Sequence, residues 1–417
     1  AALVLAAARP RHGGPSRHAQ HLATIAPQSA SEETAMKWYW SELVPAQGQA
    51  PVDRVVTFEP DHGGWNNIRM AAEVAAAYAV ATRRTLVLPP AIPMYLLEGN
   101  ATAFQEFMTL TDSADLRLIT MSEYLGRSYI TPPADITSSL QQPNGLSMPQ
   151  ADRLWQWLEK GSYLSEFESE KQYLAFGNVS RDEDGEGRVP YTLTIAEETA
   201  PVVHFRAVEP YRLLTHFYCS LRAEPQEDRR IKRAVRDSFR YTDTIVRMAE
   251  AVIAKLTKVS GGEYHAIHVR KGDFLRQQKE ASEKTLVNAL LSKIPEHSTL
   301  YVATDDPSEW LDDLREHYNV LIFQNVSDAL NPPPDPKFVG PVEQLVASRA
   351  KIFFGTWWST FTGYIMRIRG HLGLESSSFY TMKDYRDEMT QFHACRGRGW
   401  WREWPSMWEP DGPDGPP

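Results

Sequence analysis

The chain has 417 residues, of which 42% are hydrophobic and 23% charged, with 24 glycines and 29 prolines. This composition excludes a disordered, collagen-like or coiled-coil chain, and the length predicts two or three globular domains. The formal net charge of −9 disfavours nucleic acid as a partner, because nucleic-acid binding depends on neutralising phosphates with Lys and Arg.

Both ends of the chain lack the pattern of a packed element. Residues 1–50 are rich in Ala, Pro, His, Gln and Ser, which predicts a flexible segment, and residues 391–417 form a Trp-rich tail that finishes in Pro and Gly. The longest apolar run, Ala1 to Ala8, is far shorter than the roughly 20 residues that cross a bilayer. We therefore expect a membrane link only through an N-terminal anchor that this sequence lacks.

Cysteine usage and glycosylation sequons bear on the compartment. Cys219 and Cys395 are the only cysteines, so at most one disulfide can form, and their spacing is not that of a structural metal site. Three N-x-S/T sequons begin at Asn100, Asn178 and Asn325. They favour the secretory pathway, in the lumen of the ER or Golgi.

The first predicted elements alternate between strand and helix. Arg54–Phe58 is a β-branched run typical of a strand, residues 61–64 predict a turn, and the Ala-rich residues 67–82 predict a helix buried against a sheet. Thr85–Leu88 predicts the next strand. Residues 90–215 give a weaker pattern, and the acidic stretch 166–188 is expected to be a surface insertion.

The second half repeats the alternation after one or two helices predicted over 227–258. The predicted strands are Tyr264–Val269, Leu300–Ala303, Val320–Phe323 and Ile352–Phe354, separated by helices near 282–294, 307–318 and 341–350. Such alternation predicts a parallel, doubly wound sheet. The fold class is therefore α/β, with two Rossmann-like domains, residues 51–225 and 226–390, that face a central cleft and bind ligand at the carboxyl ends of their strands.

The first candidate motif is HVRKGDF, where a strand ends in polar residues. His268 and Arg270 lie on one face of the strand, since side chains alternate, and Asp273 lies just past its end. The planar guanidinium of arginine suits phosphate oxygens, and a nearby carboxylate can orient it. An Arg–Asp pair that only closes a strand end has the same spacing, and the spacing alone does not separate the two.

The second motif is FFGTWWSTFTG, in which a strand leads through a loop into a helix. Ser359 and Thr360 are placed to cap that helix, whose free N–H groups and positive dipole end form a site for an anion such as phosphate. An ordinary helix cap would have the same sequence.

The third motif is GGWNNIR, between the first strand and the first helix. Paired glycines let the backbone approach a ligand closely, and Asn66 is the polar side chain at this position. The chain contains neither GxGxxG at this point nor GxxxxGK[ST] anywhere, which disfavours dinucleotide and P-loop functions. A tight structural turn is the alternative.

The fourth motif, YVATDD, ends a strand on Asp305 and Asp306. These carboxylates are suited to a sugar hydroxyl or a base edge more than to a metal, and Pro307 also makes them candidate helix caps. No HExxH, CxxC, GxSxG or kinase motif occurs, so metalloprotease, serine-hydrolase and kinase functions are disfavoured and no metal site is predicted.

Taken in chain order, GGWNNIR, HVRKGDF, YVATDD and FFGTWWSTFTGYIMRIRG resemble four motifs of the GDP-fucose-dependent protein O-fucosyltransferase superfamily, over roughly residues 53 to 385. The resemblance implies a GT-B fold, a GDP-sugar donor, no cofactor or metal, and inverting transfer. In that family an Arg in the position of Arg270 holds the diphosphate and stabilises the departing GDP. The resemblance assigns supporting or nucleoside contacts to Asp273 and His268, and phosphate contacts to Ser359 and Thr360.

The resemblance also implies that Phe361 is the aromatic residue beside this hydroxyl pair, and that Gly64 and Asn66 form a loop that reaches the donor across the cleft. With Asp305 from the fourth motif, these residues complete the predicted donor site. The family's Asn is often followed by Gln, whereas this chain has Asn67.

The motif does not identify the general base. One branch of the family carries Glu at a position that is Gly63 in this chain. Glu59, Asp61 and His62 lie close by, and we rank Asp61 first. Other branches manage without an enzyme base.

The sequence therefore predicts a glycosyltransferase that moves fucose from GDP-fucose to a hydroxyl of a protein or glycan. A related transferase using another nucleotide-deoxysugar such as rhamnose, and an inactive glycan- or protein-binding relative, remain alternatives. A metal-dependent nucleotide-binding hydrolase is a third. The many Trp residues are more typical of packing than of sugar stacking.

Overall fold

The computed structural model describes residues 36–40, 53–61, 63–94, 101–127, 130–140, 145–164, 171–176, 189–191, 193–208, 220–222, 225–271, 283–356, 359–374, 379–382 and 389–391. The predictions that fall on His62, Asp273, the two cysteines and the tail beyond residue 391 lie outside these ranges.

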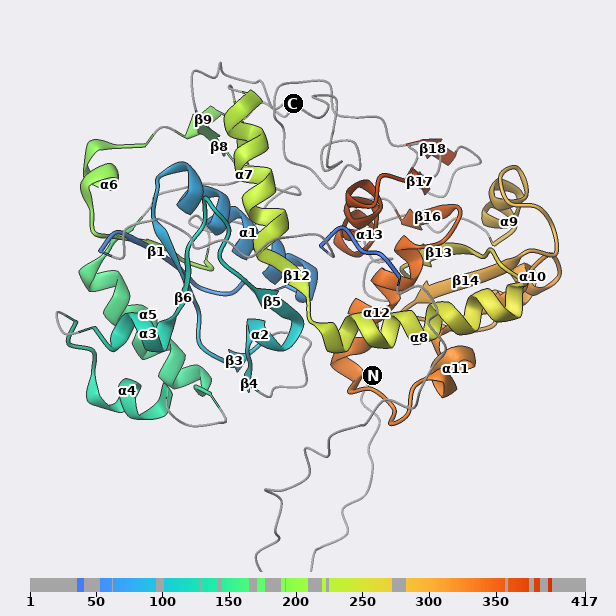
Figure 1. The fold of residues 1–417 in the computed structure, drawn as a ribbon, viewed down its shortest axis with the longest axis horizontal. Coiled ribbons are helices and arrows are strands. Elements are labelled where there is room, and N and C mark those ends of the chain that lie inside the picture. Colours follow the sequence, from blue (N-terminus) through green and yellow to red (C-terminus); the bar gives the residue numbers. More distant parts are fainter. Residues whose placement is uncertain are drawn as a thin grey trace, which may run out of the picture. The chain divides into compact units, whose positions relative to one another are not determined.

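The N-terminal half contains, in its described part, a sheet of five parallel strands in the order β6-β2-β1-β10-β7 (Figure 1). Along the chain these are β1 Val55–Phe58, β2 Thr85–Leu88, β6 Leu118–Thr120, β7 Tyr163–Leu164 and β10 Val202–Phe205. The predicted strand over 54–58 and helix over 67–82 are present as β1 and as α1, Trp65–Ala81.

Alternation along β1 sends its side chains to two different layers. Val55 packs into a cluster that includes Leu154 and Leu158 of α5, Met148–Gly161. On the opposite face Phe205 of β10 meets the ring of Tyr78 in α1, with the ring centroids 4.9 Å apart. Helix α1 is buried along most of its length because it is rich in alanine, as expected for a helix laid on a sheet.

The C-terminal half contains a second sheet in the order β15-β14-β13-β16-β17-β18, parallel except for the antiparallel pair β17–β18. Its strands are β13 His265–Val269, β14 Thr299–Thr304, β15 Asn319–Leu321, β16 Phe353–Thr356, β17 Phe379–Met382 and β18 Met389–Gln391. Every residue of β13 is buried, because a parallel sheet is covered on both faces.

One face of this sheet, through Ile267 and Val269, packs against α9, Glu283–Leu291, and α10, Leu311–Arg315. His268 therefore points to the other face, on the side of α12, Pro336–Ser348, and α13, Thr360–His371.

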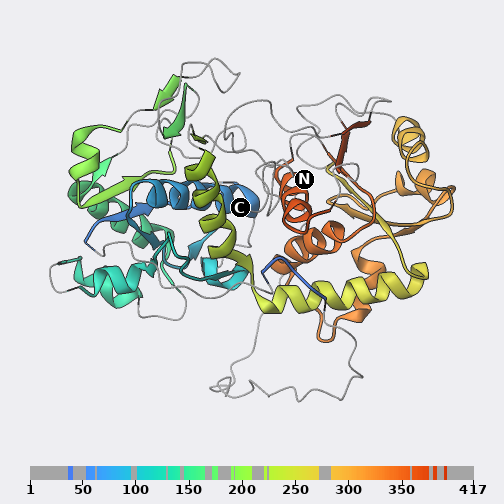
Figure 2. The ribbon, with the colours of Figure 1, turned by 45° about the horizontal axis from the view of Figure 1, so that its top comes forward.

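Two helices connect the halves, within the predicted stretch 227–258. They are α7 Pro225–Ser238 and α8 Asp243–Ser260, with the short strand β12 Phe239–Tyr241 between them. Strand β12 pairs antiparallel with β5, Met108–Leu110. Helices α8 and α12 pack against each other and lie side by side in both views (Figure 2).

The remaining elements are short. The strands are β3 Ile92–Pro93, β4 Ala101–Thr102, β8 Gln172–Phe176, β9 Val189–Tyr191 and β11 Ser220–Arg222; the helices are α2 Phe104–Phe107, α3 Met121–Leu125, α4 Ala134–Leu140, α6 Ile195–Thr199, α11 Phe323–Val326 and the 3-10 helix η2 Ser327–Ala329. None of the described helices is long and apolar enough to cross a membrane.

Three local predictions need correction. The strand predicted over Val320–Phe323 ends at Leu321, because Phe323 begins α11. The helix predicted over 307–318 is only the five residues of α10. The helix predicted near 341–350 begins earlier in the chain, since α12 runs from Pro336 to Ser348. The surface insertion predicted over 166–188 stays a prediction; of this stretch the structure describes β8, which pairs with β9 and β11 in a three-stranded sheet.

Candidate functional site

The carboxyl end of β13 carries the buried imidazole of His268. Its Nδ1 lies 2.7 Å from the hydroxyl of Thr362, and its ring stacks on Phe361 with 4.4 Å between centroids. Burial, reinforced by the positive charge of Arg270, lowers the pKa of His268 to about 3. The His268 ring is therefore neutral near pH 7 and presents a flat, uncharged surface.

The hydroxyl of Thr356, at the end of β16, fixes the backbone where Arg270 leaves β13. It donates to the carbonyl oxygen of His268 at 3.0 Å and accepts from the backbone N–H of Arg270 at 3.0 Å. Thr356 is itself buried. The position of Arg270 at the strand end is thus set by a hydrogen bond from the neighbouring strand.

Gly355 allows α13 to approach the sheet. It is paired with His268 across the β13–β16 ladder, and a Cβ atom at this position would lie 2.2 Å from Cγ2 of Thr362. Because real Cβ atoms do not approach other atoms so closely, only glycine lets Thr362 reach His268.

The start of α13 presents a polar atom without a protein partner. Ser359 occupies the N-cap position and is only 2% exposed, yet its side chain makes no capping hydrogen bond. Within the described part of the chain its Oγ has no hydrogen-bond partner. The prediction that Ser359 caps the helix is therefore wrong for the side chain, and the hydroxyl stands beside the free N–H groups of the first turn that begins at Thr360.

Asn66 is connected to this site by a hydrogen bond from Gln344, a residue that the sequence motifs did not indicate. The amide nitrogen of Gln344, on α12, donates to Asn66 Oδ1 at 3.0 Å and to the carbonyl oxygen of Phe361 at 3.1 Å. Tyr241 donates to Gln344 Oε1 at 2.5 Å, which holds the amide in this orientation. Gly64 is the N-cap residue of α1, next to Trp65. Two motifs from opposite halves of the chain are thereby tied together.

Asp305 lies at the end of β14, beside β13. Its carboxylate accepts from the backbone N–H of Lys271 at 2.8 Å, and the Lys271 ammonium lies 4.7 Å from the ring centre of Trp310. No helix begins at Pro307, so Asp305 does not act as the helix cap that the sequence allowed.

A buried charge cluster joins α1 to α13. Glu73 accepts from both terminal nitrogens of Arg367, at 2.8 and 2.6 Å, and from Arg69 at 2.8 Å. All three side chains are almost fully buried, and the Arg69 guanidinium also lies 3.6 Å from the centre of the Tyr364 ring. The sequence does not predict the link between the two helices, because Arg367 and Glu73 are 294 residues apart in the chain.

The carboxyl end of the N-terminal sheet has a cavity of 250 Å³. Its wall includes Glu59 and Asp61 after β1, Trp155 and Asp152 of α5, and Arg206 after β10. Both candidate bases that the structure describes, Glu59 and Asp61, therefore face the same space.

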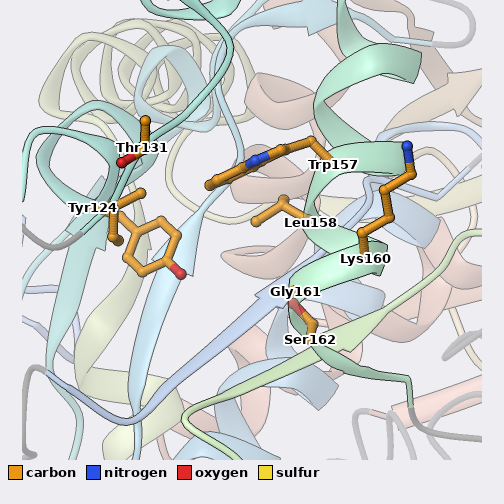
Figure 3. A pocket seen from close by; sticks show the side chains of 8 residues that line it. Tyr124, Thr131, Trp157, Leu158, Lys160, Gly161 and Ser162 are labelled. Carbon is orange, nitrogen blue, oxygen red and sulfur yellow. The ribbon is translucent and has the colours of Figure 1, made fainter.

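A second hollow, of 370 Å³, lies toward the C-terminal end of α5 (Figure 3). It is lined by Tyr124, Ile130, Thr131, Trp157, Leu158, Lys160, Gly161 and Ser162. In the view of Figure 3 the Tyr124 ring faces Leu158 across the hollow. None of the predicted site residues that the structure describes lines it.

With this geometry in place, the comparison with protein families is decisive. A family model described as GDP-fucose protein O-fucosyltransferase matches residues 55–372. The chain belongs to this family. All four motifs lie inside the matched range, so the resemblance inferred from them is confirmed.

Individual relatives are more distant. GDP-fucose protein O-fucosyltransferase 2 of Drosophila melanogaster is 33% identical over 129 residues, which are 29% of this chain and 26% of that protein. The matched stretch thus spans about a quarter of that O-fucosyltransferase.

Among solved structures, the apo form of POFUT1 is 14% identical, with 78% of this chain and 97% of that chain covered and a TM-score of 0.42. NodZ α-1,6-fucosyltransferase soaked with GDP-fucose is also 14% identical, with 81% and 98% covered and a TM-score of 0.42.

Among the described residues, no group of three or more His, Cys, Asp or Glu side chains is arranged to hold a metal ion. The groups gathered at the end of β13 are instead hydroxyls, backbone N–H groups and a neutral imidazole. Such groups suit the oxygens of an anionic ligand.

Proposed function

We propose that this chain transfers fucose from GDP-fucose to a hydroxyl group of a protein or glycan acceptor, with inversion at the anomeric carbon. The family match supports the reaction. The observation that carries the donor site is the Ser359 hydroxyl, buried at the start of α13 without a partner in the described part of the chain. A buried hydroxyl left unpaired is costly unless a ligand completes it.

In this proposal the diphosphate of the donor binds between the first turn of α13 and Arg270. Ser359 and Thr360 donate to phosphate oxygens together with the free N–H groups of the helix. The guanidinium of Arg270 stabilises the charge that develops on the leaving diphosphate, which is electrostatic stabilisation of the transition state. Thr356 positions the backbone that carries Arg270.

The remaining donor contacts follow from the same geometry. The stacked pair of His268 and Phe361 forms the wall of the nucleotide site, and Asn66 reaches it through Gln344. We assign Gly64 to the same loop as Asn66 and Asp305 to a donor hydroxyl or base edge. Asp273, outside the described residues, is proposed to orient Arg270.

The two sheets are proposed to form the two Rossmann-like domains of a GT-B enzyme, with the acceptor on the N-terminal side and the donor on the C-terminal side. Three sequons support a location in the secretory lumen. An acceptor hydroxyl in the cavity near β1 would meet the carboxylates of Asp61 and Glu59.

Calorimetric titration with GDP-fucose tests the donor assignment. We expect binding to weaken by about 2 kcal/mol in Arg270→Ala, because a charged hydrogen-bond partner of the diphosphate is lost. Arg315→Ala is the matched control, since Arg315 forms an exposed pair with Asp312 on α10. GDP-rhamnose, GDP-mannose and UDP-glucose are titrated in parallel. Tighter binding of another nucleotide sugar would replace fucose in the proposal, and no binding of any of them would reject a transferase function.

A further inference from the structure

The buried histidine of β10, His204, connects the core of the N-terminal sheet to the cavity beside β1. Its ring is fully buried, and its Nδ1 lies 2.8 Å from the hydroxyl of Thr57. Its Nε2 lies 3.4 Å from Oε1 of Glu59. Trp155 stacks over the ring, with 6.2 Å between centroids. Each ring nitrogen of His204 therefore has an oxygen partner.

Glu59 is held from two sides and still reaches the cavity. Its Oε2 accepts from the backbone N–H of Ala207 at 2.9 Å, and its Oε1 faces His204. The Glu59 side chain is 10% exposed and forms part of the cavity wall, beside Asp61. A carboxylate fixed by two partners and open to a cavity has the pre-organisation that a general base needs.

The cavity lies at the edge of the N-terminal sheet at which a ligand is expected to bind. Glu59 follows β1, and parallel α/β sheets bind ligands at the carboxyl ends of their strands. The same loop continues into α1, where Asn66 is linked through Gln344 to Phe361 beside the proposed donor site. A hydroxyl bound in this cavity would therefore meet the Glu59 carboxylate at the start of the loop that leads to Asn66.

We infer that Glu59 accepts the proton of the acceptor hydroxyl and that His204 positions the Glu59 carboxylate. This inference rests on the proposed function. In the step, the acceptor oxygen forms a bond to the anomeric carbon while the bond from that carbon to the phosphate oxygen breaks. The bonding electron pair leaves with GDP, and the acceptor proton passes to Glu59.

The histidine can donate to the carboxylate while its other ring nitrogen keeps a partner. In the neutral tautomer with hydrogen on Nε2, the Nδ1 of His204 accepts from the hydroxyl of Thr57, 2.8 Å away. The Nε2–H then donates to Glu59. This arrangement favours Glu59 over the sequence-based choice of Asp61.

Water and azide serve as acceptor probes, so the test does not depend on the natural acceptor. Hydrolysis of GDP-fucose uses water, which must lose a proton, whereas azide attacks carbon without losing one. We expect Glu59→Gln and Glu59→Ala to lower the rate of hydrolysis by on the order of 100-fold or more. Azide should restore turnover in Glu59→Ala, giving fucosyl azide at a rate within a few-fold of the wild type.

Three further variants separate the roles. Asp61→Asn should lose less hydrolysis than Glu59→Gln. His204→Gln keeps an N–H near Glu59 and should lower kcat about 10-fold with the donor KM unchanged, as expected when one positioning hydrogen bond is weakened. Glu263→Gln, which changes an exposed pair with Lys351, should match the wild type. Should the His204 variant fail to fold, the Glu59 variants still decide.

The outcomes are distinguishable from a failure of the proposed function. GDP-fucose that does not bind the wild type rejects the proposed function itself. If the wild type binds GDP-fucose, the role of Glu59 is overturned by unchanged hydrolysis in Glu59→Gln, by a larger loss in Asp61→Asn, by the lack of azide rescue, or by a wild type that hydrolyses nothing.

Discussion

The carboxyl ends of the two sheets differ in the side chains that surround β13 and β1. At the C-terminal sheet, the end of β13 is surrounded by the hydroxyls of Thr356 and Thr362 and by that of Ser359, which has no partner among the residues that the structure describes. At the N-terminal sheet, the cavity after β1 is walled by the carboxylates of Glu59 and Asp61. One edge is suited to oxygens that carry negative charge, and the other to taking up a proton.

The comparison shows that the sheet topology sets where a ligand can bind. The residues that follow the strands then determine which chemical groups the ligand meets there. Both edges are carboxyl ends of parallel strands followed by a helix. They differ because β16 leads into Ser359 and Thr360, whereas β1 leads into Glu59 and Asp61. In the proposed function, the first edge would hold the anionic leaving group and the second the proton acceptor.

The largest expected effect comes from breaking the charge cluster that joins the helices behind these two edges. Glu73→Gln leaves the guanidinium groups of Arg69 and Arg367 buried without their counter-charge. We expect the free energy of unfolding to fall by about 3–5 kcal/mol, as is typical when one partner of a buried ion pair is removed. Urea unfolding measures this change.

The matched control for Glu73 is Asp135→Asn. Asp135 pairs with Arg153 at 2.9 Å, but both side chains are about half exposed, so the loss should stay below about 1 kcal/mol. Equal losses in the two variants would show that burial does not distinguish the pairs.

The next largest expected effect comes from comparing the packing around two glycines, one in each half of the chain. Gly355→Ala places a methyl group 2.2 Å from Thr362 Cγ2, and overpacking of this kind should lower the free energy of unfolding by about 2 kcal/mol. Gly161, at the end of α5 in the N-terminal half, has nothing within 4 Å of an added Cβ. Gly161→Ala should therefore be neutral or stabilising by about 0.5 kcal/mol. Thermal or urea unfolding that ranks the two variants in reverse would contradict the packing described for α13.

The sequence predicted the elements whose pattern is local. Thr85–Leu88 is β2 as predicted, because a short apolar run stopped by Pro89 and Pro90 is sufficient to indicate a strand. Three of the four motifs placed Asn66, His268, Arg270 and Ser359 at strand ends and helix starts, as the structure has them.

Long-range partners could not be predicted in the same way. Thr57 and His204 are 147 residues apart, and they meet only because β1 lies next to β10 in the strand order. Gln344 follows another polar residue, Glu343, on α12, and nothing local shows that its amide joins Asn66 to Phe361. Such contacts depend on the order of the strands in the sheet and on which face of each helix packs against it. A single motif shows neither.

A last comparison concerns a carboxyl group that the C-terminal half keeps neutral. Burial raises the pKa of Glu343, on α12, to about 8 from an ordinary value of 4.5, although the hydroxyl of Tyr301 donates to it at 3.0 Å. Between these two pH values the folded state binds more protons than the unfolded state. The contribution of Glu343 to stability is therefore complete below pH 4.5 and is lost as the pH rises through 8.

Glu343→Gln cannot titrate, so its stability relative to the wild type should increase steadily from pH 5 to pH 8. Urea unfolding at pH 5, 6, 7 and 8 measures this difference, with Glu263→Gln as the exposed control from the same half. Parallel curves for wild type and Glu343→Gln would mean that the carboxyl group is ionised in the folded protein throughout. A growing difference would show that packing against β14 favours this carboxyl group in its protonated form, which extends the contrast with the carboxylate-lined cavity beside β1.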